Sequence, residues 1–154
     1  AMPGAFMGGQ GDYVILFEPT ASTMEKEGKG YIVASLGEES GEVPYTAYFT
    51  KKSTIKKNPE LIARFTRAIY KGQQWVATHS PEEIARAIKP HFPDEPDEIL
   101  VKAIKRYKDQ NTWKKDPLLL ESDFYLLQDI IKAAGELDKI APYEKVVTTE
   151  FVPR

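Results

Sequence analysis

Hydrophobic and polar positions follow two different patterns, one before about residue 58 and one after it. In the first part, short continuous apolar runs bounded by glycine, proline and charged residues predict buried strands at 12–17, 31–36 and 45–49. Such runs are typical of parallel strands that are covered on both faces. With a helix between the first two, residues 12–36 form a strand–helix–strand unit, which favours an α/β fold with few, mainly parallel strands.

Helices are predicted where apolar side chains recur every three or four positions. The helix inside the 12–36 unit begins at Pro19, which suits a first turn, and ends at Gly28. Residues 2–11 are small and glycine-rich and suit either a short helix or a loop. The tail from Pro142 is predicted to be a short extended segment. Four later helices have apolar faces made by Leu61, Phe65, Ala68, Ile69 and Val76; by Ile84, Ala85 and Ile88; by Ile99, Leu100, Ala103, Ile104 and Tyr107; and by Phe124, Leu127, Ile130, Ile131, Ala134 and Leu137.

Two of these helices have clear starting signals. Asn58-Pro59-Glu60 combines a capping residue, a proline at the first helical position and an acid in the first turn. Ser80-Pro81-Glu82-Glu83 has the spacing of a capping box, in which the serine and Glu83 would each bind the other's backbone N–H. Residues 37–44, by contrast, are polar and rich in glycine, and they form the clearest linker in the chain.

Composition narrows the classes of function. The chain has 154 residues, of which 42% are hydrophobic and 29% charged, as in an ordinary globular domain. The net charge of -2 argues against nucleic acid as the main partner. The absence of cysteine excludes disulfides, thiolate metal sites and cysteine nucleophiles. The apolar runs are too short to span a bilayer, and the N-terminus does not have the pattern of a signal peptide.

No residue pattern predicts catalysis, a cofactor or a metal site. His79 and His91 are the only histidines, and neither has a metal-ligating partner four positions away. No serine lies in a G-x-S-x-G context, and neighbouring acids such as Glu82 and Glu83 do not face each other on a helix. We therefore expect a protein that is not an enzyme.

One short segment is a candidate binding corner. Phe17-Glu18-Pro19-Thr20 lies between the end of a predicted strand and the start of a helix. Ligands of open α/β sheets bind beyond the carboxyl ends of strands, where Glu18 could pair with a cationic group and Phe17 could offer an apolar face. Equally, Glu18 could only complement the dipole of the following helix. The residues alone leave these two interpretations open.

Several motifs, in this order and spacing, resemble one family. They are Gly8-Gly9-Gln10-Gly11-Asp12-Tyr13-Val14, Leu16-Phe17-Glu18-Pro19, residues 25–35, Pro44-Tyr45-Thr46-Ala47-Tyr48, Lys57-Asn58-Pro59-Glu60-Leu61-Ile62, and Ser80-Pro81-Glu82-Glu83-Ile84-Ala85. The resemblance is to the C-terminal half of ABC-transporter substrate-binding proteins of the nitrate, sulfonate, taurine and thiamine-precursor group. It extends over nearly the whole chain.

The resemblance implies a fragment of a type II periplasmic-binding-protein-like fold, in which two lobes close on a small ligand. Residues 1–36 would form the end of lobe two, residues 37–44 a hinge containing Gly37, Gly41 and Pro44, and residues 45–154 a mainly helical return to lobe one. Because the corner lies at the cleft in this family, the resemblance gives ligand-contact roles to Phe17, Glu18, Thr20 and, more weakly, Tyr13 and Tyr48.

The function implied is capture of a small organic or inorganic solute for an ABC importer. The full-length protein would be extracytoplasmic, periplasmic or lipid-anchored at the cell surface, and would deliver its solute to a permease. The alternatives are an enzyme like those that make the thiamine pyrimidine on this fold, and a helical module in which residues 58–137 dock on a partner. A lone fragment would also expose core surface, so we expect copies of it to associate.

Overall fold

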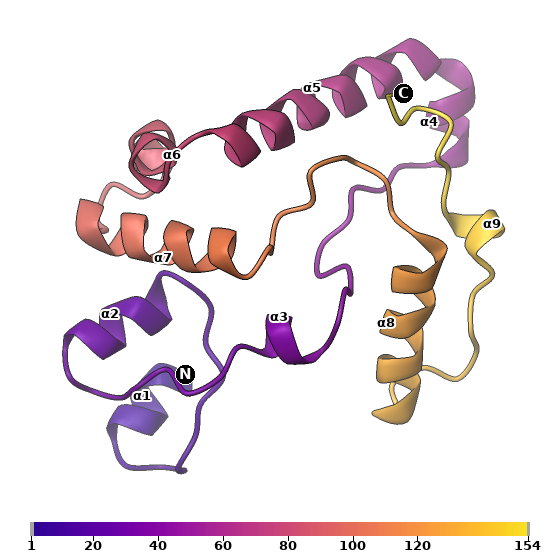
Figure 1. Ribbon diagram of the computed structural model, residues 1–154. Coiled ribbons are helices and arrows are strands. Elements are labelled where there is room, and N and C mark those ends of the chain that lie inside the picture. The colour runs from indigo at the N-terminus through magenta and orange to yellow at the C-terminus, as the bar shows by residue number, and fades with distance from the viewer. Residues whose placement is uncertain (1, 154) are drawn as a thin grey trace. The chain divides into compact units, whose positions relative to one another are not determined.

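The computed structural model describes residues 2–153, and its regular elements are helical (Figure 1). None of the helices in this part of the chain combines the length and the hydrophobicity that a membrane crossing requires. In chain order the elements are α1 (Met2–Met7), α2 (Thr20–Lys26), α3 (Leu36–Glu39), α4 (Lys52–Lys57), α5 (Pro59–Thr78), α6 (Pro81–Ile88), the 3-10 turn η1 (Lys89–His91), α7 (Asp97–Asp109), α8 (Glu121–Ala133) and α9 (Tyr143–Val146).

The chain divides into two compact units, each made of two separate stretches. Unit 1 comprises residues up to 35 together with 79–112, and unit 2 comprises 36–78 together with the residues from 113 onward. Unit 1 therefore contains α1, α2, α6, η1 and α7, whereas unit 2 contains α3, α4, α5, α8 and α9.

Unit 1 has an apolar core between α6 and α7, with α2 on the other side of α7. The side chains less than 9% exposed that make this core are Met24, Ile84, Ala85, Ile99, Leu100, Ala103 and Ile104. Each large aliphatic side chain buried in this way contributes roughly 1.5–3 kcal/mol. Apart from Met24 of α2, these residues are ones that the helical spacing predicted for two of the faces, so that part of the prediction is confirmed. Ile88 and Tyr107, predicted for the same two faces, are only half-buried.

Local sequence signals predicted the start of α6 correctly. Ser80 accepts a hydrogen bond from the Glu83 amide, and the Glu83 carboxylate accepts one from the Ser80 amide, so the predicted capping box is formed. Residues 2–11 begin with a helix, which settles one of the two open interpretations. The fourth predicted helix was too long, because Gly135 adopts a positive φ of 77° just beyond α8 and ends it.

The three predicted strands require a correction. Residues 13–17, 31–35 and 46–50 have no regular secondary structure, and no strand occurs anywhere between residues 2 and 153. The physical reason is that a strand exists only when a neighbouring strand pairs with its backbone groups. An apolar run can indicate that a segment suits a sheet, but it cannot supply the neighbour. The α/β class is thus not confirmed by this chain's own structure.

The strand-like pattern survives in the side chains. Along the first segment Tyr13, Ile15 and Phe17 are 82%, 62% and 58% exposed, whereas Val14 and Leu16 between them are half-buried. This period of two is that of a strand with one covered and one open face.

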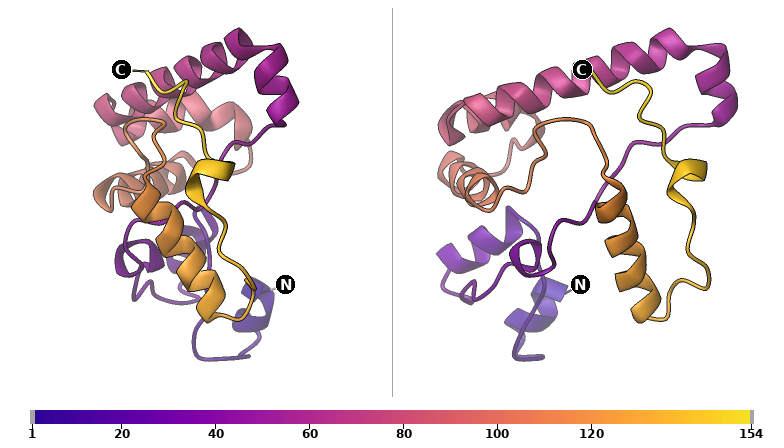
Figure 2. Two further views of the ribbon diagram at one scale, coloured as in Figure 1. Left: turned by 90° about the vertical axis from the view of Figure 1, so that its right-hand side faces the viewer. Right: turned by 45° about the vertical axis from the view of Figure 1, so that its right-hand side comes forward.

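Unit 2 is joined by polar contacts and by aromatic pairs, among them Phe124 and Tyr143, whose ring centroids are 5.6 Å apart. Figure 2 shows the C-terminal segment returning beside α8. The Gln128 side chain donates to the Ala141 carbonyl at 3.1 Å and accepts from the Ala141 amide at 2.7 Å. The Tyr143 hydroxyl donates to the Leu119 carbonyl at 2.5 Å. Two short helices were not foreseen: α3 lies inside the predicted linker, and α9 replaces the predicted extended tail.

Candidate functional site

The predicted corner lies in unit 1, at the junction between the 13–17 segment and α2. Glu18 precedes the helix, joined to Pro19 by a cis peptide bond. Its carboxylate is 5% exposed, although carboxylates seldom lie buried without a partner. Oε2 accepts from the Ser22 amide at 3.0 Å, and Oε1 accepts from the Ser22 hydroxyl at 3.0 Å and from Arg106 Nη1 at 2.5 Å. Glu18 therefore ties the start of α2 to α7.

Glu25, one helix length further on, makes a second tie between α2 and α7. Its Oε2 accepts from Lys102 Nζ at 2.7 Å and lies 3.5 Å from Arg106 Nη2. Its Oε1 accepts from the backbone amide of Ile32 at 3.3 Å, which fixes the 31–35 segment as well. The Lys102 ammonium and the Ile32 amide hold the pKa of the Glu25 carboxyl below its usual value.

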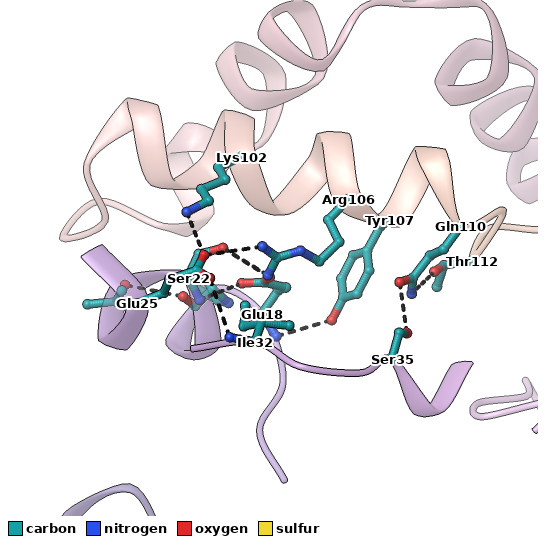
Figure 3. Close-up of polar contacts among 12 residues, drawn as sticks. Glu18, Ser22, Glu25, Ile32, Ser35, Lys102, Arg106, Tyr107, Gln110 and Thr112 are labelled. Carbon is teal, nitrogen blue, oxygen red and sulfur yellow. Dashed lines mark hydrogen bonds and ion pairs between the residues drawn. The ribbon is translucent and has the colours of Figure 1, made fainter. Parts of the chain in front are cut away.

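The polar face of α7 also contacts the far ends of both segments (Figure 3). The Tyr107 hydroxyl accepts a hydrogen bond from the Glu18 amide at 3.2 Å. Gln110 Oε1 accepts from the Ser35 hydroxyl at 2.9 Å, and Gln110 Nε2 donates to the Thr112 hydroxyl at 2.7 Å. One helix thus holds the residue at the end of the 13–17 segment and the residue at the end of the 31–35 segment.

Sequence reasoning missed these α7 residues. The basic side chains between residues 97 and 109 suggested an ordinary helix face exposed to solvent. A signal was nevertheless present, because Lys102, Arg106 and Gln110 are spaced by four and share one side of a helix. What the sequence could not supply was their partner, since Glu18 precedes Arg106 by 88 positions.

The other predicted contact residues have different environments. Phe17 is 58% exposed, and its carbonyl accepts from the Ala21 amide at 3.1 Å. Thr20 is exposed at the first position of α2, and Tyr13 is 82% exposed at the other end of its segment. Unit 1 thus holds four of the five predicted residues, with Phe17, Glu18 and Thr20 adjacent in the corner.

Tyr48 belongs to unit 2. Its ring packs edge to face on Phe65 of α5, with ring centroids 4.9 Å apart and an interplanar angle of 82°. The geometry therefore gives Tyr48 a packing partner within its own unit.

The predicted hinge residues fall in and around α3. Gly37 lies within α3, and Gly41 follows it with a φ of 76°, a conformation in which glycine is strongly favoured. A Cβ at Gly41 would also lie 3.4 Å from Cδ2 of Leu126. Pro44 is half-buried. Backbone freedom is thus required at Gly41, and the hinge role stays a prediction.

The histidines are placed separately from the corner. His79 lies just before α6, where its carbonyl accepts from Lys108 Nζ at 2.5 Å, and His91 ends η1. Over residues 2–153, no three His, Cys, Asp or Glu side chains gather in a way that could hold a metal ion.

The contacts of this cluster hold the corner in one conformation. The carboxylates of Glu18, just before α2, and of Glu25, within it, are matched by two cations of α7. The cluster therefore carries no net charge. Phe17 and Thr20 stand on its open side with apolar surface and a hydroxyl. Such a corner suits non-covalent recognition.

Comparisons with known proteins give a matching family model and a similar curated protein. A family model described as NMT1/THI5 like matches residues 2–84. The chain is also 50% identical, over 150 residues, to a Bacillus subtilis (strain 168) protein named "Putative binding protein YtlA". That alignment covers 97% of this chain and 45% of the relative, so the chain spans a little under half the length of the curated relative that it matches. No solved structure matches the chain.

The family match includes all four unit 1 residues predicted to contact ligand and also Tyr48. It implies a periplasmic-binding-protein-like fold, which the sequence resemblance had also indicated. Since the matched residues make up more than half of the chain, the chain belongs to the NMT1/THI5-like family.

Proposed function

We propose that this chain forms part of a solute-binding protein that captures a small molecule for an ABC importer. The observation that carries the proposal is the 50% identity, over nearly the whole chain, to a relative named as a binding protein. The corner supports it, because a fixed backbone with an exposed Phe17 and Thr20 suits reversible recognition. The whole protein would act outside the cytoplasm and pass its solute to a permease.

In this proposal the solute contacts are Phe17 and Thr20, with Tyr13 and Tyr48 as further candidates from the two units. A hinged protein encloses its ligand between two lobes. Because the chain spans 45% of its relative, we expect part of the enclosing surface to come from the remainder of such a protein.

A chimera tests the proposal most directly. In it, this chain replaces the matching 45% of the Bacillus relative. Thermal stability is then measured with nitrate, taurine, an alkanesulfonate, the thiamine pyrimidine and riboflavin. A solute that binds only the native form stabilises it by about 2.7 kcal/mol at a concentration of 100 times Kd. Failure of every solute in this panel to raise the stability would count against the proposal.

Two aromatic substitutions make a matched pair in that assay. Phe17→Ala should abolish most of the solute-dependent stabilisation, because it removes the apolar side of the corner. Tyr31→Ala removes a ring of similar size that is 89% exposed in the same unit, and it should leave the solute effect unchanged. Equal losses in both variants would remove the corner from the proposal. Recovery of the bound solute unchanged would further separate a binding protein from a pyrimidine-forming enzyme.

A second proposal is that copies of the chain associate when the rest of a binding protein is missing. The observation in its favour is the open row of Tyr13, Ile15 and Phe17. In the same unit, Tyr31 and Val33 are also more than 70% exposed. Apolar rows of this kind are avoided on monomer surfaces. Light scattering at micromolar concentration should give more than the monomer mass, and Ile15→Lys should reduce it. A monomer at every concentration would contradict this proposal.

A further inference from the structure

We infer that Arg106 and Tyr107 of α7 and its C-cap residue Gln110 are positioning residues for the binding corner, and that Glu18 is a structural residue and not a ligand of the solute. Glu18 accepts from Arg106 through its side chain and donates to Tyr107 through its backbone amide. The inference rests on the proposed function, because it assumes that the corner binds a solute. It deepens that function by saying which groups select the solute. It revises the role that sequence resemblance gave to Glu18.

The first argument is that most of the bonding capacity of Glu18 is already used. Its two oxygens accept three hydrogen bonds from Ser22 and Arg106, and the carboxylate is 5% exposed. Ser22 itself is fully buried. A solute cation that reached Glu18 would compete with the guanidinium for this nearly buried side chain. Displacing the guanidinium would leave half-buried Arg106 with only its longer contacts of 3.5 Å to Glu25 and Ser22, which is costly.

The second argument is charge balance. Arg106 bridges Glu18 and Glu25, and Lys102 adds a second cation at Glu25. Two carboxylates therefore face two cations within a few ångströms. The field beyond such a balanced cluster is weak, so the cluster gives little attraction to a charged solute.

The third argument is the register of the contacts along α7. Arg106 and Gln110 are four residues apart on one side of the helix, with Tyr107 next to the first. Arg106 and Tyr107 fix the side chain and the backbone of Glu18, and Gln110 fixes Ser35. The ends of both non-helical segments are thus held by one rigid element. A site supported by neighbouring side chains in this way keeps its geometry when ligand is absent.

The consequence concerns the class of solute. Selection at this corner falls to the ring of Phe17, the hydroxyl of Thr20 and nearby backbone groups. Those groups recognise apolar surface and hydrogen-bonding atoms, and they do not distinguish an amine from an anion by charge. Glu18 affects the affinity for all solutes alike, through the shape of the corner.

Hydrogen exchange on the 154-residue chain tests the positioning role without any ligand. Tyr107→Phe removes the acceptor of the Glu18 amide, so that amide should exchange about tenfold faster, as expected for the loss of one hydrogen bond. Arg106→Gln should accelerate exchange at Ser22, whereas Arg106→Lys, which keeps a charge for Glu18, should restore part of the protection. Lys105→Gln is the matched control, because Lys105 pairs only with exposed Asp109 on the same helix.

Unchanged exchange at Glu18 and Ser22 in the Tyr107 and Arg106 variants would overturn the positioning role. If protection is lost throughout the α6–α7 core as well, the variant is globally destabilised. The comparison is then repeated with Gln110→Ala, which removes the contacts to Ser35 and Thr112 and should give faster exchange near Ser35. Absence of that change also overturns the inference.

Solute binding by the chimera tests the role of Glu18. Glu18→Gln keeps an acceptor for Ser22 but removes the ion pair. It should weaken the binding of nitrate and of the thiamine pyrimidine by the same factor, about tenfold. A loss confined to the amine-bearing pyrimidine would make Glu18 a solute ligand and overturn the inference, while leaving the proposed function intact. Should no solute of the whole panel bind the unmodified chimera, the proposed function fails, and hydrogen exchange still decides the positioning role.

Discussion

The two units are stabilised in different ways. In unit 1 the helices α6 and α7 meet through aliphatic side chains such as Leu100 and Ile104, which are 3% and 4% exposed. In unit 2 the residues of the described chain that reach the same degree of burial are polar, namely Asp123 and Gln128. Large apolar side chains are open to solvent in both units, and Phe49 of unit 2 is 97% exposed.

This difference shows which part of the chain contains its own core. Burial of apolar area is the main favourable term in folding, and unit 1 has it within its own residues. Unit 2 has hydrogen bonds, which contribute about 1 kcal/mol each, and aromatic pairs such as that of Tyr48 with Phe65. We therefore expect unit 1 to be the more stable of the two, and we expect the exposed apolar groups of unit 2 to be covered in a protein of the relative's length.

The largest expected effect is that of a truncation in the unit 1 core. Leu100→Ala removes a side chain that is 3% exposed, and such changes cost about 2–5 kcal/mol because they lose transfer energy and leave a cavity. The free energy of unfolding is measured by urea denaturation followed by circular dichroism.

Ile130→Ala in α8 is the matched control, because this side chain is 43% exposed. It should cost under about 1 kcal/mol, as surface substitutions generally do. Both tryptophans, Trp75 and Trp113, belong to unit 2, so their fluorescence reports on that unit alone. Comparable losses for Leu100→Ala and Ile130→Ala would contradict the contrast between the units.

The next largest effect concerns the polar clamp of unit 2. Gln128→Ala removes both hydrogen bonds to Ala141 and leaves two backbone groups without these partners. An unsatisfied buried group costs about 1–3 kcal/mol, so tryptophan fluorescence should show unit 2 unfolding at lower urea. Gln128→Glu, which keeps an acceptor for the Ala141 amide, should lose less. An unchanged midpoint in Gln128→Ala would mean that this clamp does not stabilise unit 2.

A smaller effect is expected when the pH is lowered, and it should appear in unit 1. The pKa of Glu25 is lowered by its hydrogen bond from Lys102, and the pKa of Glu83 is lowered by its bond from the Ser80 amide. A lowered folded-state pKa gives stability that is present above the usual value of 4.5 and is lost as the pH falls through the folded value. Exchange at the Ile32 amide should therefore rise below about pH 4.5 relative to core amides.

Glu25→Gln is the control for this acid effect, because it should remove most of the pH dependence at Ile32. Asp109→Asn changes an exposed acid of the same unit and should not. The same profile in both variants would show that Glu25 is not its source.

Helices could be predicted from this sequence because their signals are local. The apolar spacing of Ile99, Leu100, Ala103 and Ile104 lies within one segment, and the capping box of Ser80 and Glu83 covers four residues. Backbone bonds in a helix also join residues four apart, so the segment contains its own partners. These features were correctly placed for that reason.

Strands and the corner could not be predicted in the same way. The runs at 13–17 and 31–35 have the side-chain pattern of strands, but pairing depends on segments elsewhere. Glu18 was a candidate from its place before α2, and its burial against Arg106 depends on a contact 88 positions away. The choice between a ligand contact and a structural acid was therefore open until α7 was placed.

The smallest effect is expected at alkaline pH, and it should appear in unit 2. Glu42 and Asp123 raise the pKa of the Lys114 ammonium above its usual 10.5, and burial raises the pKa of the Tyr143 hydroxyl above 10.0. A raised folded-state pKa gives stability that is fully present below the usual value and is lost as the pH rises through the folded value. Lys114 is 45% exposed, so solvent screening keeps its share small. The urea midpoint from the tryptophan emission wavelength should fall above about pH 10, and Lys114→Gln should reduce that fall. The opposite result would be faster exchange at core amides of unit 1, such as Leu100, with the tryptophan midpoint unchanged. That result would contradict the assignment of acid sensitivity to unit 1 and alkaline sensitivity to unit 2.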